Sequence, residues 1–61
     1  MTIKVLMIDP DITFIVPVKR ALETMGDYVV NGFASGKPGL EQARRDHFDI
    51  AVIDVRVEDM T

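Results

Sequence analysis

The stretch VLMIDPD, Val5 to Asp11, runs from an apolar segment directly into two carboxylates that flank a proline. The apolar segment begins at Ile3 and ends at Ile8. Because it is apolar at nearly every position, it is typical of a β-strand that is covered on both faces. We therefore predict a buried strand whose carboxyl end presents Asp9.

Apolar residues at helical spacing follow this strand and predict an amphipathic helix. They are Phe14, Val18, Ala21, Leu22 and Met25. Gly26 is a suitable stop signal. Pro17 lacks a backbone N–H and is tolerated in a first turn but not in a helix interior. We therefore expect the helix to begin late, with Thr13 as its N-cap.

The rest of the chain repeats the strand and helix pattern. A second strand is predicted over Tyr28–Phe33, and a third over Phe48–Val55. Between them Ser35 should cap a helix that ends near Arg45, with Pro38 in its first turn. This order predicts an α/β fold with right-handed crossovers and a parallel sheet of order 2-1-3, with the first strand central.

Such a sheet needs helices on both faces, and two helices cover three strands poorly. We therefore expect residues 1–61 to be a truncated piece of a larger α/β domain, or a unit that self-associates to gain cover.

Composition excludes several classes of protein. With 48% hydrophobic and 28% charged residues the chain is globular rather than disordered. Its net charge of −3 argues against direct nucleic acid binding. The start MTIKVLM is not expected to be a signal peptide, and no apolar run approaches the roughly 18 residues of a membrane span. Without cysteine there is no disulfide or thiolate metal site, so a cytoplasmic protein is expected.

Two acidic residues end adjacent strands of the predicted sheet. Asp9 follows the first strand, and Asp54 ends the core of the third. Ligands of open α/β sheets bind at this carboxyl edge. Two carboxylates brought together repel unless a cation relieves them, and Mg²⁺ prefers such oxygen ligands. A carboxylate there could also attack phosphorus. The alternative is that both residues merely begin turns.

Three segments together resemble the first half of a response-regulator receiver domain. They are IKVLMIDPD, VKRALETMGDYVVNGFASG and LEQARRDHFDIAVIDVRVEDM. The resemblance implies a flavodoxin-like fold in a two-component phosphorelay. It implies that Asp54 accepts a phosphoryl group from a histidine kinase, and that Asp9, Asp54 and the Arg56 backbone carbonyl bind Mg²⁺. The chain would then be a regulatory phosphoacceptor and not an enzyme.

The sequence also departs from the receiver pattern. Pro10 stands where the family usually carries a second acid, and Asp11 would reach over only if the loop shifts. Glu58 and Asp59 replace the usual proline and glycine. The family's Ser or Thr and Lys on later strands have no counterpart in the chain. The two added acids could either partly restore cation affinity or repel an incoming phosphate. With Pro10 in place of an acid, we expect weakened Mg²⁺ binding and slower or absent phosphorylation.

Two other functions are compatible with parts of the sequence. NGFASGKPG resembles a phosphate-binding loop, but only three residues separate Gly32 from Gly36 and Pro38 replaces the required hydroxyl residue. A degenerate receiver used for docking or dimerisation is favoured by Pro10. It is also favoured by three apolar residues that widen the first helix face, which could equally be core: Ile12, Ile15 and Val16. His47, the only histidine, is expected to be a solvated turn residue.

Overall fold

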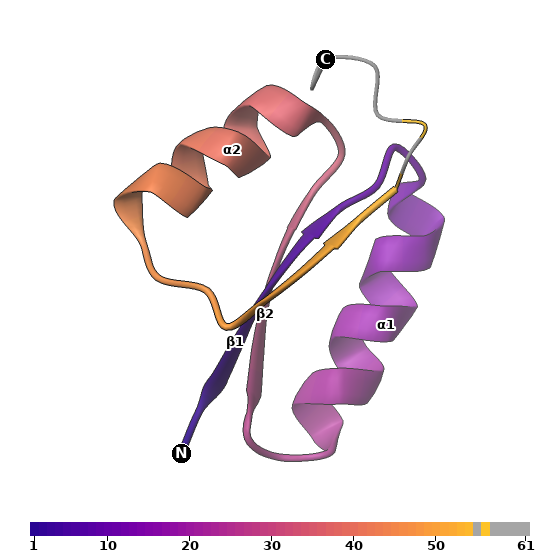
Figure 1. Ribbon diagram of the computed structural model, residues 1–61. Coiled ribbons are helices and arrows are strands. Elements are labelled where there is room, and N and C mark those ends of the chain that lie inside the picture. Colours follow the sequence, from indigo (N-terminus) through magenta and orange to yellow (C-terminus); the bar gives the residue numbers. More distant parts are fainter. Residues whose placement is uncertain (55, 57–61) are drawn as a thin grey trace.

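Three strands and two helices alternate along the chain (Figure 1). The computed structural model describes residues 1–54 and 56. The elements are β1 (Ile3–Ile8), α1 (Ile12–Thr24), β2 (Tyr28–Phe33), α2 (Gly36–Arg45) and β3 (Ile50–Ile53). Both strand pairs are parallel, and the sheet order is β2-β1-β3. The predicted α/β content and strand order 2-1-3 are confirmed.

The core lies on both faces of the central strand β1. Figure 1 shows α1 and α2 on opposite sides of the sheet. Because successive side chains of a strand point to opposite faces, β1 supplies alternate residues to two clusters. Val5 and Met7 pack with Ile15 of α1, whereas Leu6 and Ile8 pack with Phe33 on the α2 side. This two-sided burial explains why β1 is apolar throughout.

Two glycines let the helices approach the sheet closely. A Cβ built at Gly32 of β2 would lie 2.5 Å from Cγ2 of Ile15. A Cβ at Gly39 of α2 would lie 2.5 Å from Cδ1 of Ile8. Side chains at these positions would push α1 and α2 away from the sheet, so both glycines are needed for packing.

The first helix begins earlier than predicted. Asp11, not Thr13, is the N-cap, and its carboxylate accepts a hydrogen bond from the Thr13 amide at 3.0 Å. Pro17 therefore lies inside α1, where its ring cannot donate to the carbonyl one turn earlier. The prediction was wrong because Asp is a strong N-cap. The helix with this earlier start also carries Ile15, whose side chain is buried in the core.

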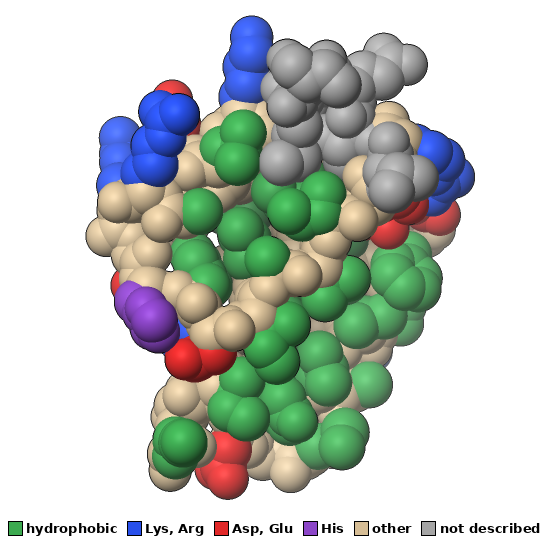
Figure 2. Space-filling view, in the orientation of Figure 1, with side chains coloured by type: hydrophobic (Ala, Val, Ile, Leu, Met, Phe, Trp, Pro, Cys, Tyr) green, Lys and Arg blue, Asp and Glu red, His purple; other side chains and the backbone are tan. Residues whose placement is uncertain are grey.

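Strand β3 is shorter and less covered than predicted. It spans Ile50–Ile53 instead of Phe48–Val55, and Val55 lies outside the described residues. All four β3 residues are exposed, including Val52 at 49%. The helices pack against β1 and β2, as expected when two helices serve three strands. In Figure 2 hydrophobic side chains gather over β3 and extend toward α1.

No helix within residues 1–54 and 56 combines the length and apolar character that crossing a membrane requires.

Candidate functional site

The carboxyl ends of β1 and β3 form a pocket of about 350 Å³. Asp9 begins the loop after β1, and its amide donates to the Phe33 carbonyl at 3.0 Å. Asp54 follows β3, and its amide donates to the Ile8 carbonyl at 2.8 Å. The parallel pairing therefore brings both residues to the same edge, as predicted. We call this the acid pocket; its lining is Asp9, Asp11, Phe14, Val52, Ile53, Asp54 and Arg56.

Asp9 is the buried acid of the pocket, at 8% exposure. Its Oδ1 accepts a hydrogen bond from the Asp11 amide at 2.8 Å, which closes a turn around the exposed Pro10. An Asp that bonds to the backbone two residues later is a common turn former, and proline suits the turn because its φ is fixed. Pro10 thus supports the loop geometry but supplies no carboxylate.

Asp11 does not take the place of the missing acid. Its Oδ1 accepts from the Thr13 amide at 3.0 Å and from the Thr13 hydroxyl at 2.5 Å. These bonds, the hydroxyl bond first, lower the pKa of the Asp11 carboxyl. Asp11 lines the acid pocket, but Oδ1 is engaged in capping α1.

Asp54 is held by the side chain of Arg56. Nε of Arg56 donates to Oδ1 at 2.9 Å, and Nη2 donates to Oδ2 at 2.6 Å. The Arg56 amide adds a third bond to Oδ1 at 2.8 Å. This two-pronged pairing is a strong form of charge-assisted hydrogen bond. The side-chain bonds from Arg56, followed by its amide, hold the pKa of the Asp54 carboxyl well below its usual range.

The Arg56 guanidinium also faces the second acid. Its Nη2 lies 3.8 Å from Oδ1 of Asp9. The Asp54 and Asp9 side chains are only 16% and 11% exposed, whereas that of Arg56 is 69% exposed. The guanidinium is therefore a cation on the solvent side of two sheltered acids. It relieves the repulsion that the sequence predicts for two converging carboxylates.

This role of the Arg56 side chain was not predicted from the sequence. The resemblance assigned its backbone carbonyl to Mg²⁺, and that assignment stays a prediction. A signal was nevertheless present, because Asp54 and Arg56 are separated by one residue at a strand end. At this spacing an Asp side chain often accepts the amide two residues later, which brings the following side chain alongside.

The acid pocket offers a divalent cation two carboxylates, which is the ligand chemistry that Mg²⁺ prefers. Within residues 1–54 and 56, no group of three or more His, Cys, Asp or Glu side chains could hold a metal ion. Both oxygens of Asp54 already accept hydrogen bonds from Arg56. The carboxylate oxygens of Asp9 and Asp54 therefore fit a divalent cation only when the Arg56 guanidinium moves aside. Glu58 and Asp59, the other acids considered, lie outside the described residues.

His47 lies in the turn before β3, at the opposite end of that strand from the acid pocket. Its side chain is 82% exposed, as predicted for a solvated turn residue, and Nε2 lies 3.1 Å from Oδ1 of Asp49. Asp49 also accepts from the Lys4 amide at 2.9 Å. These contacts join the turn to the start of β1 and are structural.

Known proteins provide no independent assignment of the site. No protein-family model, curated protein or solved structure was found to match the chain. The features that bear on function are the sheet topology, the two acids at the carboxyl edge of the sheet and the Arg56 guanidinium beside them.

Proposed function

We propose that the chain is the phosphoryl-accepting receiver module of a cytoplasmic two-component system, with Asp54 as acceptor and a histidine kinase as donor. One observation carries the proposal. Asp54 follows β3 beside the central strand, and shares a pocket with Asp9 at the edge where parallel α/β sheets bind ligands. The module is a regulatory acceptor, and any enzyme activity belongs to its partners.

The proposed reaction uses the Asp54 carboxylate as nucleophile. One carboxylate oxygen bonds to phosphorus while the bond from phosphorus to the kinase imidazole nitrogen breaks. The imidazole keeps that electron pair, and Asp54 becomes an acyl phosphate. Because hydrogen bonds from Arg56 keep the pKa of Asp54 low, its carboxyl is ionised at neutral pH.

Asp9, Asp54 and the Arg56 carbonyl are the residues proposed to hold Mg²⁺. A bound Mg²⁺ offsets negative charge on the phosphoryl oxygens. Pro10 removes one acid from the set, so we expect weak metal binding and slow phosphorylation.

Intact-mass spectrometry after treatment with acetyl phosphate tests the proposal. In this assay the Asp54 oxygen bonds to phosphorus and acetate leaves with its electron pair. We expect an adduct of one phosphoryl group that requires Mg²⁺, disappears in Asp54→Ala and forms faster in Pro10→Asp. An adduct that persists in Asp54→Ala would refute Asp54 as the acceptor.

A second candidate is a degenerate receiver that docks to another protein without phosphorylation. It is favoured by the exposed apolar side chains of α1, with Ile12 at 60% and Val16 at 49%. Ile15 is not part of that surface, because it is 5% exposed and belongs to the core. An adduct on Pro10→Asp but none on the wild type would support this candidate. Docking should then ignore Mg²⁺ and fail in Val16→Glu.

A further inference from the structure

The acid pocket has its own cation. Arg56 donates three hydrogen bonds to Asp54, two from the guanidinium and one from the amide. The same guanidinium approaches Asp9 to 3.8 Å. It therefore contacts the two carboxylates that a divalent cation would use, and it does so from the exposed side of the pocket.

We propose that Arg56 is a tethered counter-cation that closes the acid pocket, and that a divalent cation has to displace its guanidinium to bind Asp9 and Asp54. Two positive groups cannot share these oxygens without repulsion, which is strong at the short distances of direct ligation. Displacement also breaks the bonds from Nε and Nη2 to Asp54. The guanidinium can leave readily, because its side chain is 69% exposed.

The closed arrangement also restrains Asp54 as a nucleophile. Both of its oxygens accept hydrogen bonds from Arg56, Oδ1 from Nε and the amide and Oδ2 from Nη2. An oxygen that attacks phosphorus needs a free lone pair directed at the incoming group. Within the described residues Oδ2 accepts only the bond from Nη2 and keeps a second lone pair, so the guanidinium lowers the nucleophilicity of this oxygen and narrows the approach to it. Opening of the Arg56 contact would therefore speed phosphorylation. This consequence rests on the proposed function, whereas the competition for cations does not.

Pro10 helps the Arg56 guanidinium to compete with a divalent cation for the acid pocket. A carboxylate at that position would add an oxygen ligand that favours a divalent cation over a single guanidinium. Asp11, the next acid along the chain, uses Oδ1 to cap α1. Arg56 therefore competes against a pocket with a reduced set of metal ligands.

Binding of Mn²⁺, a spectroscopically visible substitute for Mg²⁺, tests the proposal directly. The free ion would be measured by electron paramagnetic resonance during titration of the 61-residue chain. We expect Arg56→Ala to raise the Mn²⁺ affinity by roughly fivefold, the upper range for loss of one exposed ion pair. Arg56→Lys, which keeps the charge without the two-pronged geometry, should give a smaller rise.

A matched variant controls for net charge. Arg44 is an exposed arginine in the last turn of α2 and does not line the acid pocket. Arg44→Ala should leave the Mn²⁺ affinity close to that of the wild type, and Asp54→Asn in the Arg56→Ala background should abolish the gain. Equal affinities of Arg56→Ala and Arg44→Ala, including no binding by either, would overturn the proposal.

The acetyl phosphate assay separates this proposal from the proposed function. Faster phosphorylation of Asp54 in Arg56→Ala, together with tighter Mn²⁺ binding, would support both. Tighter Mn²⁺ binding without an adduct on Asp54 in any variant would retain the tethered cation and refute the phosphoacceptor. An adduct on Asp54 with unchanged Mn²⁺ affinity in Arg56→Ala would do the reverse.

Discussion

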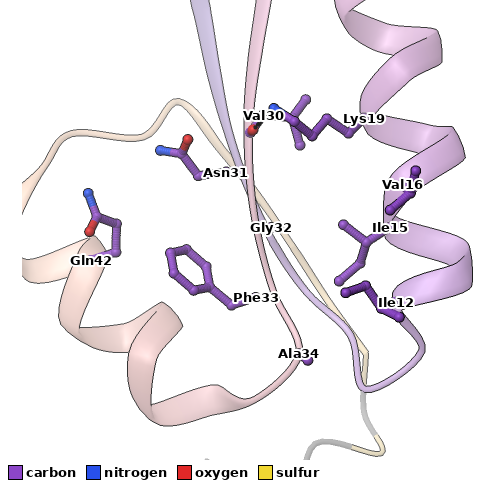
Figure 3. A pocket seen from close by; sticks show the side chains of 10 residues that line it. All are labelled: Ile12, Ile15, Val16, Lys19, Val30, Asn31, Gly32, Phe33, Ala34 and Gln42. Carbon is purple, nitrogen blue, oxygen red and sulfur yellow. Dashed lines mark hydrogen bonds between the residues drawn. The ribbon is translucent and has the colours of Figure 1, made fainter.

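The two outer strands of the sheet, β2 and β3, present their free edges to solvent in different ways. At the β2 edge the Val30 amide donates to Oε2 of Glu23 at 3.0 Å. The Val30 carbonyl accepts from Nζ of Lys19 at 2.8 Å, and Figure 3 draws these two residues. Lys19 and Glu23 also pair with each other at 2.9 Å. Side chains of α1 therefore satisfy both outward backbone groups of Val30.

Within the described part of the chain, the β3 edge has no such protection. The Asp54 amide bonds to the Ile8 carbonyl of β1, so the alternation of parallel pairing turns the amides and carbonyls of Ala51 and Ile53 outward. No side chain among residues 1–54 and 56 bonds to the backbone of β3. An open apolar edge strand is a template for pairing with another chain. Among the described elements, the difference arises because α1 packs over β2 and leaves the residues of β3 exposed.

Substitution of two valines, one in each outer strand, compares how much side-chain burial on β2 and on β3 contributes to the free energy of unfolding. Val30 is 1% exposed and Val52 is 49% exposed. We expect Val30→Ala to lower the free energy of unfolding by about 2 kcal/mol, because it removes buried methyl groups and leaves a cavity. Val52→Ala should change it by less than about 0.5 kcal/mol. Urea unfolding followed by circular dichroism measures both, and equal losses would show that β3 is covered in solution.

Self-association of the chain is expected to involve the open edge of β3 and not the protected edge of β2. We expect the chain to associate through β3 as concentration rises, and a charge on that strand to oppose it. Val52→Lys should raise the dissociation constant by roughly tenfold, equivalent to about 1.4 kcal/mol. Light scattering over a range of concentrations measures the change.

The matched control for this experiment lies on β2. The exposed fraction of Val29, 41%, is similar to the 49% of Val52, but the edge of its strand is protected by side chains of α1. Val29→Lys should therefore leave association unchanged. A wild-type chain that stays monomeric at every concentration, or an equal effect of both lysines, would contradict association through β3.

Much of the fold could be predicted because the strand and helix patterns are clearly separated along the sequence. The predicted bounds of β1 and β2 match the structure, although Lys4 interrupts the apolar run of β1 and Asn31 and Gly32 lie within β2. Ser35 and Arg45 correctly delimit α2, although the Ser35 side chain makes no capping hydrogen bond. The start of α1 could not be predicted, because Pro17 argued for a later cap than Asp11. Packing of the whole helix decides between the two possible N-caps, Asp11 and Thr13, and local propensity carries no information about that packing.

The candidate site was predictable only where it depends on topology. Strand order alone brings Asp9 and Asp54 to one pocket. The direction of the Arg56 side chain depends on the turn after β3, and the pairing of Lys19 with Val30 depends on how α1 lies over β2. Sequence spacing records neither, so both contacts became visible only in the folded chain.

The smallest expected effect concerns the Glu23 carboxylate at the β2 edge. Its pKa is lowered from the ordinary value of 4.5, first by the hydrogen bond from the Val30 amide and then by that from Lys19. A lowered pKa in the folded state means that the ionised group stabilises the fold fully above pH 4.5. This contribution is lost as the pH falls through the lowered value. Glu23→Gln should therefore be less stable than the wild type at neutral pH, and the gap should close in acid.

Hydrogen exchange at the Val30 amide reports this contact locally. Gln retains an oxygen acceptor without charge, so we expect exchange in Glu23→Gln to be faster by roughly threefold at neutral pH. Glu41→Gln, which removes the same charge from α2, should leave the Val30 amide unchanged. A ratio of wild-type to variant exchange that stays constant between neutral and acidic pH would mean that the charge of Glu23 does not protect the β2 edge. Protection would then come from burial under α1 alone, the cover that β3 lacks.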